Sequence, residues 1–220
     1  IVAVNPNNPT GSYLRLDERS RLLATGLALI VDEVFLPYAL EGSAPSMPAA
    51  REGLVFRLSG LSKLVALPQM KLGWIAVEGD DELVRESLRR LEHLNDAYLS
   101  AGAPVQEAAP RLLELRGRVQ RAILARCRSN LAILDSALSC CPALSRTRVE
   151  GGWYALVRLP RVRSEEEWVL GLLDIGVLVQ PGWFYDFADE AWVVLSLITP
   201  EDAFAAGVAA LTRFVTESLA

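Results

Sequence analysis

The chain has 220 residues, of which 51% are hydrophobic, so it can bury a sizeable core as one large or two small domains. Its formal net charge of -5 excludes a general attraction to nucleic acid or to an anionic membrane, and no apolar run approaches the roughly 18 residues of a membrane span. The three cysteines, at positions 127, 140 and 141, lack the spacing of metal ligands. We therefore expect no metal site and, from the odd number of cysteines, a reducing, cytoplasmic setting.

Short apolar segments alternate with helical patterns over the first part of the sequence, as in a mostly parallel α/β sheet. Strands are predicted where apolar and β-branched residues cluster, at residues 1–4, 27–31, 54–58 and 73–77. Helices are predicted at residues 17–26 and 81–94 from the spacing of their apolar residues. Residues 95–103 interrupt the pattern.

Pro104 suits the first turn of a long helix, which is expected to reach about residue 138. Beyond Pro142 the sequence mixes short strands with helices. The strands are predicted at residues 153–159, 177–180 and 192–198, and the helices at residues 165–173 and 200–219. This mixture indicates a small α+β domain from about residue 140 to residue 220.

Polar residues follow three of the predicted strands. An asparagine-rich loop at residues 5–11 follows the first strand, Asp32 ends the second, and Ser62-Lys63 follows the third. Open α/β sheets bind their ligands at the carboxyl ends of the strands. We therefore expect an amide, a carboxylate and an amine to meet at one edge of the sheet.

Three motifs at these positions, in this order and spacing, resemble those of the class I/II aminotransferases. They are Asn-Pro-Asn-Asn-Pro-Thr-Gly at residues 5–11, Asp-Glu-Val-Phe at residues 32–35, and Ser62-Lys63 with a cation, Lys71, eight residues later. The resemblance implies the α/β fold of the PLP-dependent transferases of fold type I. In that fold the chain would hold part of the large, mostly parallel-sheet domain (1–103), a long interdomain helix (104–139) and the small α+β domain (140–220).

The resemblance also implies an activity in amino acid metabolism. The protein would transfer an amino group between an amino acid and a 2-oxo acid with pyridoxal 5'-phosphate (PLP) as its cofactor. Family members carry nearly as much chain again ahead of the position of Ile1, so this sequence is expected to be the C-terminal portion of a longer protein. Because family sites are completed by a second subunit, a homodimer is expected, with small-molecule substrates and with neither nucleic acid nor membrane as a partner.

By the same resemblance, five residues have roles at the cofactor. Lys63 would be the catalytic residue, joined to the cofactor aldehyde as a Schiff base and moving a proton once the substrate has displaced it. Asp32 would raise the pKa of the cofactor's ring nitrogen by charge interaction, and Asn8 would hydrogen-bond its 3' oxygen. Ser62 and Lys71 would contact its phosphate. The plainer alternatives are that Asp32 caps a turn and that Asn8 serves only the turn chemistry of Asn-Pro.

At two positions this sequence has another residue where the family usually has an arginine. Lys71 stands where most relatives have an arginine, so the phosphate would lose a bidentate partner. Val194 stands where an arginine normally binds the substrate's α-carboxylate. Either another cation such as Arg158 replaces that arginine, or the substrate is not an ordinary α-amino acid, or the site is degenerate.

Two other functions remain open. A PLP-dependent lyase or decarboxylase-like enzyme of the same fold would share Lys63 and Asp32 but break a different bond. An aminotransferase-like sensing domain of a transcriptional regulator would need a basic DNA-binding segment, and no stretch of this sequence resembles one. The single histidine, His93, has no serine motif near it, which argues against a Ser-His-Asp hydrolase.

Overall fold

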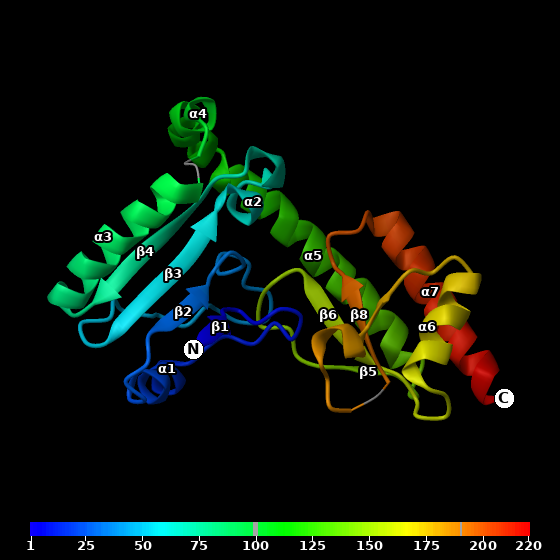
Figure 1. Cartoon of the computed structure of the whole chain (residues 1–220). Coiled ribbons are helices and arrows are strands. Elements are labelled where there is room, and N and C mark those ends of the chain that lie inside the picture. Colours follow the sequence, from blue (N-terminus) through cyan, green and yellow to red (C-terminus); the bar gives the residue numbers. More distant parts are fainter. Residues whose placement is uncertain (99–100, 190) are drawn as a thin grey trace.

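The computed structural model describes residues 1–98, 101–189 and 191–220 and arranges them around two four-stranded sheets. The first sheet is formed by the N-terminal part of the chain and the second by the C-terminal part. Helix α5 (Arg116–Ser139) runs from one sheet to the other (Figure 1). No helix in the described part of the chain combines the length and the apolar character needed to cross a bilayer.

The first sheet has the strand order β1-β2-β3-β4, formed by Val2–Val4, Leu29–Asp32, Leu54–Gly60 and Gly73–Gly79. β1 and β3 run parallel to β2, which confirms the predicted mostly parallel sheet, whereas β4 is antiparallel to β3. The connection from β3 to β4 holds only the one-turn helix α2 (Leu61–Leu64) and the 3-10 helix η1 (Pro68–Met70). It is too short to return the chain to the start of β3, as a parallel crossover requires, so β4 runs back beside β3.

Helix α1 (Leu16–Leu23) packs on the first sheet through two leucines of its last turn. The small apolar cluster formed there consists of Leu22 and Leu23 with Ala3, Leu29, Val31, Ala50 and Val55. Every strand from β1 to β3 contributes to this cluster, so burial of α1 holds the three strands together.

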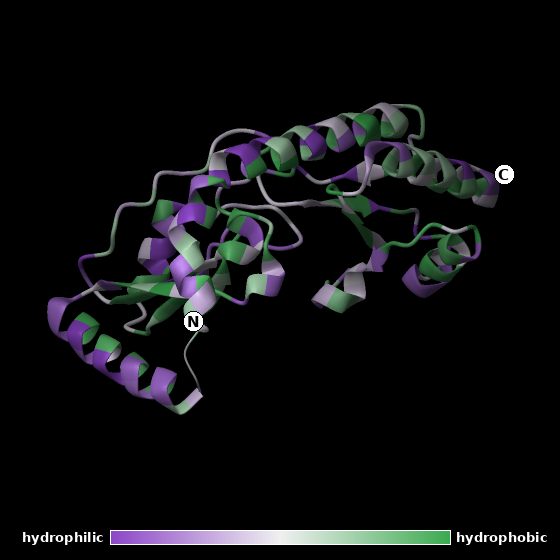
Figure 2. Cartoon of the chain, turned by 90° about the horizontal axis from the view of Figure 1, so that it is seen from above, coloured by the Kyte–Doolittle hydropathy of each residue, from purple (hydrophilic) through white to green (hydrophobic). Residues whose placement is uncertain are grey.

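Helix α3 (Asp81–Tyr98) follows β4 and confirms the helix predicted from residue 81. Leu83, Leu88 and Leu94 are 46%, 50% and 55% exposed, and Figure 2 shows apolar and polar residues alternating along this helix. The described residues therefore leave part of its apolar stripe uncovered, although Val84 and Leu91 are half-buried. The predicted break at residues 95–103 begins later than expected, and residues 99 and 100 lie outside the described residues.

The prediction of a single long helix at residues 104–138 is wrong, because two helices occupy this stretch. They are α4 (Ala103–Glu114) and α5, and they meet at Leu115. The Leu115 N–H donates to the carbonyl of Leu112 at 3.1 Å, which is the tighter spacing of a 3-10 turn. Gly117, a weak helix former, follows this turn and favours the change of direction.

The second sheet is antiparallel, with the order β5-β6-β8-β7. Its strands are Ser145–Arg146, Tyr154–Arg158, Trp192–Ser196 and Gln180–Pro181 in that order. β6 and β8 confirm two predicted strands, whereas the segment predicted at residues 177–180 joins the sheet only from Gln180. Helices α6 (Glu165–Asp174) and α7 (Glu201–Leu219) confirm the two predicted helices, and the 3-10 helix η2 spans Gly182–Tyr185.

The largest apolar core lies between the second sheet and helices α5, α6 and α7. Helix α7 contributes a stripe at helical spacing, and all four of its residues are buried: Phe204, Val208, Leu211 and Val215. Phe35 and Tyr38, from the segment after β2, also belong to this core. The first sheet is thus anchored in the core of the second.

Backbone contacts join the two sheets near their loop ends. Gly151 N–H donates to the carbonyl of Gly11, Gly152 N–H donates to the carbonyl of Tyr38, both at 2.9 Å, and Ala39 forms an isolated bridge with Gly151. Gly11 has a φ of +74°, and a Cβ there would lie 2.7 Å from the Gly151 oxygen. Only glycine permits this approach.

A charged pair at this junction gives a pH-dependent contribution to stability. The Arg146 guanidinium donates two 3.0 Å hydrogen bonds to the Glu41 carboxylate and holds the pKa of Glu41 below its usual value. A carboxyl group whose pKa is lower in the folded state than in the unfolded state stabilises the folded state at pH values above its unfolded-state pKa. This contribution is lost as the pH falls through the folded-state pKa. We expect Glu41→Gln to lower the free energy of unfolding near pH 7, with the difference from wild type disappearing below about pH 4.

Urea unfolding of the complete protein over this pH range measures the effect. Glu52→Gln, at an exposed position, controls for the loss of one negative charge. If Glu41→Gln lowered the free energy of unfolding by the same amount at every pH, the Arg146–Glu41 pair would not be the source of the pH dependence.

Gly60 ends β3 at a point where two backbone segments pass very closely. A Cβ at Gly60 would lie 2.8 Å from the Leu72 oxygen and 3.1 Å from the Gly73 Cα. We expect Gly60→Ala to destabilise the protein by about 1–3 kcal/mol, because backbone atoms must move. The same substitution at Gly207, inside α7 with no atom within 4 Å of the added carbon, should stabilise by up to about 1 kcal/mol. Thermal unfolding compares the two variants, and shifts of equal sign would count against the steric explanation.

Candidate functional site

The carboxyl ends of β1, β2 and β3 meet at one edge of the first sheet, because these strands are parallel. Val4 pairs with Asp32, and Asp32 pairs with Leu58. One step further along, Asn5 N–H donates to the carbonyl of Asp32 at 2.8 Å, and Glu33 N–H donates to that of Leu58 at 2.9 Å. The three sequence motifs therefore leave the sheet side by side, as the strand pattern predicts.

Lys63 lies in the one-turn helix α2 and is half-buried. Its Nζ is 5.5 Å from the ring centre of Phe35 and 5.2 Å from that of Trp153, so the amine faces one aromatic ring from the segment after β2 and one from the segment before β6. The main-chain carbonyl of Lys63 accepts a hydrogen bond from the hydroxyl of Tyr38. Both ends of this residue are thus in contact with aromatic side chains.

Phe35, Tyr38 and Trp153 form a compact group, which we call the aromatic cluster. The Trp153 ring lies edge-on to Phe35 at 5.3 Å and to Tyr38 at 5.0 Å, and all three side chains are buried. The sequence does not identify Tyr38 or Trp153 as site residues. The one signal that it offers is the Gly151-Gly152 pair, which permits a close backbone approach just before Trp153.

Asp32, the last residue of β2, is half-buried, and its Oδ1 accepts a 3.1 Å hydrogen bond from the N–H of Val34. This is the turn contact of the plainer alternative, and the structure contains it. A carboxylate has several acceptor positions on two oxygens, so this bond leaves capacity for a further donor. The adjacent Glu33 differs, because it is buried and paired with Arg57 at 2.7 Å.

The loop at residues 5–11 has two cis peptide bonds, Asn5–Pro6 and Asn8–Pro9. Two of the three asparagines in the loop make turn contacts. Asn5 Oδ1 accepts a hydrogen bond from the N–H of Leu14, and Asn7 Oδ1 accepts one from the hydroxyl of Thr10, both at 2.9 Å. Asn8, which directly follows Asn7, is exposed. The turn chemistry that would explain an asparagine here is therefore supplied by its neighbours.

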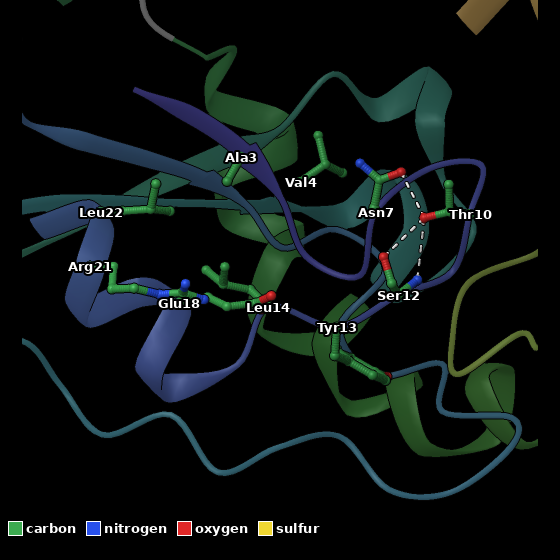
Figure 3. Close-up of a pocket in the computed structure, with 10 residues that line it drawn as sticks. All are labelled: Ala3, Val4, Asn7, Thr10, Ser12, Tyr13, Leu14, Glu18, Arg21 and Leu22. Carbon is green, nitrogen blue, oxygen red and sulfur yellow. Dashed lines mark hydrogen bonds between the residues drawn. The ribbon is translucent and has the colours of Figure 1, made fainter. Parts of the chain in front are cut away.

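A cavity of about 750 Å³ is lined by β1, α1 and the segment that connects them, which includes part of this loop (Figure 3). It is bordered by the hydrogen-bonded side chains of Asn7, Thr10 and Ser12. None of the five predicted site residues lines this cavity. The candidate site is therefore the edge that carries Lys63, and the cavity is separate from it.

Lys71 and Ser62 are brought into neighbouring segments by the short connection between β3 and β4. Leu61 N–H donates to the carbonyl of Leu72 at 3.0 Å, which ties the segment of Lys71 to the start of α2. Ser62 is half-buried and Lys71 is exposed. A hydroxyl and an ammonium group carried by neighbouring segments are donors of the kind that bind an anion.

Val194 is buried in β8. Because Val193 and Leu195 belong to the large core, Val194 points to the opposite face of the second sheet. Arg158 pairs with Trp192 on that same face, and its guanidinium carbon lies 5.6 Å from the Trp192 ring centre. On the face that Val194 occupies, the next strand pair thus holds the Arg158 guanidinium against the Trp192 indole ring.

The groups at this edge of the first sheet are an amine, a carboxylate, an amide, a hydroxyl and a second ammonium. Within the described ranges, no set of histidine, cysteine, aspartate and glutamate residues is arranged to hold a metal ion. His93 is exposed on α3, beside Arg89. The ionisable side chains that the predicted site residues supply are thus the two lysines and Asp32.

Comparison with known proteins gives relatives over most of the chain. The family model described as aminotransferase class I and II matches residues 1–206. The 4-dedimethylamino-4-oxo-anhydrotetracycline transaminase of Streptomyces rimosus is 29% identical, over 94% of this chain and 58% of that protein. The S-alkyl-thiohydroximate lyase of Arabidopsis thaliana is 31% identical, over 52% of this chain and 26% of that protein.

A solved structure shows the same fold. The probable N-succinyldiaminopimelate aminotransferase of Thermus thermophilus matches 96% of this chain with a TM-score of 0.82 and 27% identity, over 57% of its own length. This chain spans less than two thirds of each of these three proteins. Since the family model covers nearly all of the sequence, the chain belongs to the class I and II aminotransferases and has their PLP-dependent transferase fold of type I.

Proposed function

We propose that this chain is part of a PLP-dependent aminotransferase that transfers an amino group between an amino acid and a 2-oxo acid. The main support is the convergence of the Asn8 loop, Asp32 and the Lys63 turn at the ends of three adjacent parallel strands. The names of the Streptomyces and Thermus relatives point to the same reaction class. Because the chain spans only part of these relatives, the proposal concerns the complete protein.

The donor set at this edge fits PLP. Lys63 would hold the aldehyde carbon covalently as a Schiff base, and the Asp32 carboxylate would face the protonated ring nitrogen. Asn8 would donate to the 3' oxygen, and Ser62 and Lys71 would bind the phosphate. When bound, the cofactor supplies an electron sink for the substrate carbon that loses a proton.

The chain's own part in the reaction is to place and protect one amine. Lys63 Nζ is the group that would take a proton from one carbon and return it to another. The buried rings of Phe35 and Trp153, 5.5 Å and 5.2 Å away, exclude water from one side of the amine. Asp32 would keep its negative charge fixed at the end of β2, with the Val34 N–H holding its orientation.

A lyase of the same fold is the second candidate, because the Arabidopsis relative carries that activity in its name. Such an enzyme would use Lys63 and Asp32 in the same positions and break a different bond. A valine at position 194 is compatible with substrates that lack an α-carboxylate as well as with a carboxylate bound elsewhere. The three relatives above all have enzyme names, which gives no support to a sensing domain of a regulator.

Three further expectations belong to this proposal. The complete protein would be a homodimer in the cytoplasm, as the family resemblance implies. Its chain would divide into a large-domain part (1–103), a connecting region (104–139) and a small domain (140–220). The two sheets with separate apolar clusters support this division.

Product analysis separates the two enzymatic candidates. We expect the complete protein, incubated with PLP and a panel of amino acids, to yield a 2-oxo acid and the aminated cofactor. The panel includes amines without an α-carboxylate, because of Val194. Release of ammonia with an elimination product, and no aminated cofactor, would contradict transamination and favour the lyase.

The charge of Asp32 is tested by Asp32→Asn. The amide oxygen can still accept from Val34, so the turn is retained while the negative charge is lost. We expect the rate of transamination to fall by at least about 100-fold, with PLP still bound. Asp80→Asn is a matched control, because Asp80 follows β4 and accepts a 3.0 Å bond from the N–H of Glu82, two residues on, in the same way. Equal effects of the two substitutions would mean that Asp32 only caps its turn.

A further inference from the structure

The helix that carries Lys63 is unusually dependent on outside hydrogen-bond donors. Helix α2 has one turn, and the last carbonyl groups of a helix have no partner within it. Two of these carbonyls are satisfied by side chains from distant segments. The Tyr38 hydroxyl donates to the carbonyl of Lys63, and Gln120 Nε2, from α5, donates to that of Leu64 at 3.2 Å.

Tyr38 is itself held in place on all sides. Its side chain has no exposed surface, its N–H donates to the carbonyl of Phe35 at 3.0 Å, and its carbonyl accepts from Gly152 at 2.9 Å. Its ring lies 5.0 Å from that of Trp153. Burial raises the pKa of Tyr38, so the phenol keeps its proton and remains a donor.

The aromatic cluster contacts both ends of Lys63. Tyr38 binds its main chain, while Trp153 and Phe35 lie 5.2 Å and 5.5 Å from its Nζ. Trp153 directly precedes β6 of the second sheet, and the Tyr38 carbonyl accepts a hydrogen bond from the N–H of the residue before it, Gly152. The position of the amine therefore depends on the contact between the two sheets.

We propose that Tyr38 is a positioning residue for Lys63, whose hydroxyl fixes the carbonyl of the lysine and, with Trp153, sets where the amine can reach. The proposal rests on the proposed function, because it assigns a task to the amine of Lys63. Proton transfer by a side chain requires close alignment, and a misplacement of about 1 Å can cost about 100-fold in rate. The alternative is that the Tyr38 hydrogen bond contributes to stability alone.

Tyr38→Phe removes this hydroxyl and keeps the ring. Tyr13→Phe is the matched control, because Tyr13 is also buried and also donates to a backbone carbonyl, that of Leu36, at 3.2 Å. In the complete protein with PLP, we expect Tyr38→Phe to lower kcat by about 10-fold with a change in KM below about 2-fold. We expect Tyr13→Phe to lower the thermal midpoint to a similar extent and to leave kcat unchanged. Equal kcat values for the two variants would overturn the proposal.

A second measurement needs no cofactor. The sequence has lysine at positions 63 and 71 only, and Lys71 is exposed, so it serves as an internal reference. Acetic anhydride labelling of the cofactor-free protein, read by peptide mass spectrometry, gives the ratio of the Lys63 rate to the Lys71 rate. We expect this ratio to change by at least about 3-fold in Tyr38→Phe and to stay at the wild-type value in Tyr13→Phe.

The two measurements separate failure of this inference from failure of the proposed function. A labelling ratio that stays at the wild-type value in folded Tyr38→Phe would show a structural role alone and overturn the inference. A ratio that changes as expected, in a protein whose wild type forms no product with PLP, would support the positioning role and reject the aminotransferase.

Discussion

The parallel pairing of β1, β2 and β3 is the constraint from which the rest of the candidate site follows. Val4, Asp32 and Leu58 share one register, so the three chains leave the sheet at the same level. Residues separated by more than fifty positions along the sequence, such as Asn8 and Lys63, are brought to one edge by this pairing alone. The short return from β3 to β4 then ties the turn of Lys63 to the segment of Lys71.

This edge is completed by the second sheet. Glycines at positions 11 and 151 allow two backbones to touch, and the chain that leaves this contact leads directly to Trp153. The aromatic cluster is therefore both part of the large core and the surface on which the Lys63 amine rests. A lysine in this position is well placed to respond to movements between the sheets. Phe35 and Tyr38 contact it from the segment after β2, and Trp153 contacts it from the segment before β6.

Local patterns in the sequence are sufficient for the strands of the first sheet and for the three motifs, since each depends on residues close together in the chain. The stripe of α7 at Phe204, Val208, Leu211 and Val215 is of this kind, and all four residues are buried. The break at Leu115 could not be predicted, because a single 3-10 turn has no strong sequence signal. Tyr38 and Trp153 contact Lys63 although they lie 25 and 90 residues away from it in the sequence. The spacing of apolar residues does not reveal contacts between residues so far apart, so these roles could not be predicted.

The most direct test of the central claim is where the cofactor attaches. The complete protein is loaded with PLP, reduced with borohydride so that an imine becomes a stable amine, digested and mapped by mass spectrometry. The two lysines of this sequence are Lys63 and Lys71, and we predict the pyridoxyl phosphate mass on Lys63 and not on Lys71. Attachment at Lys71, or no attachment to this part of the chain, would contradict this prediction.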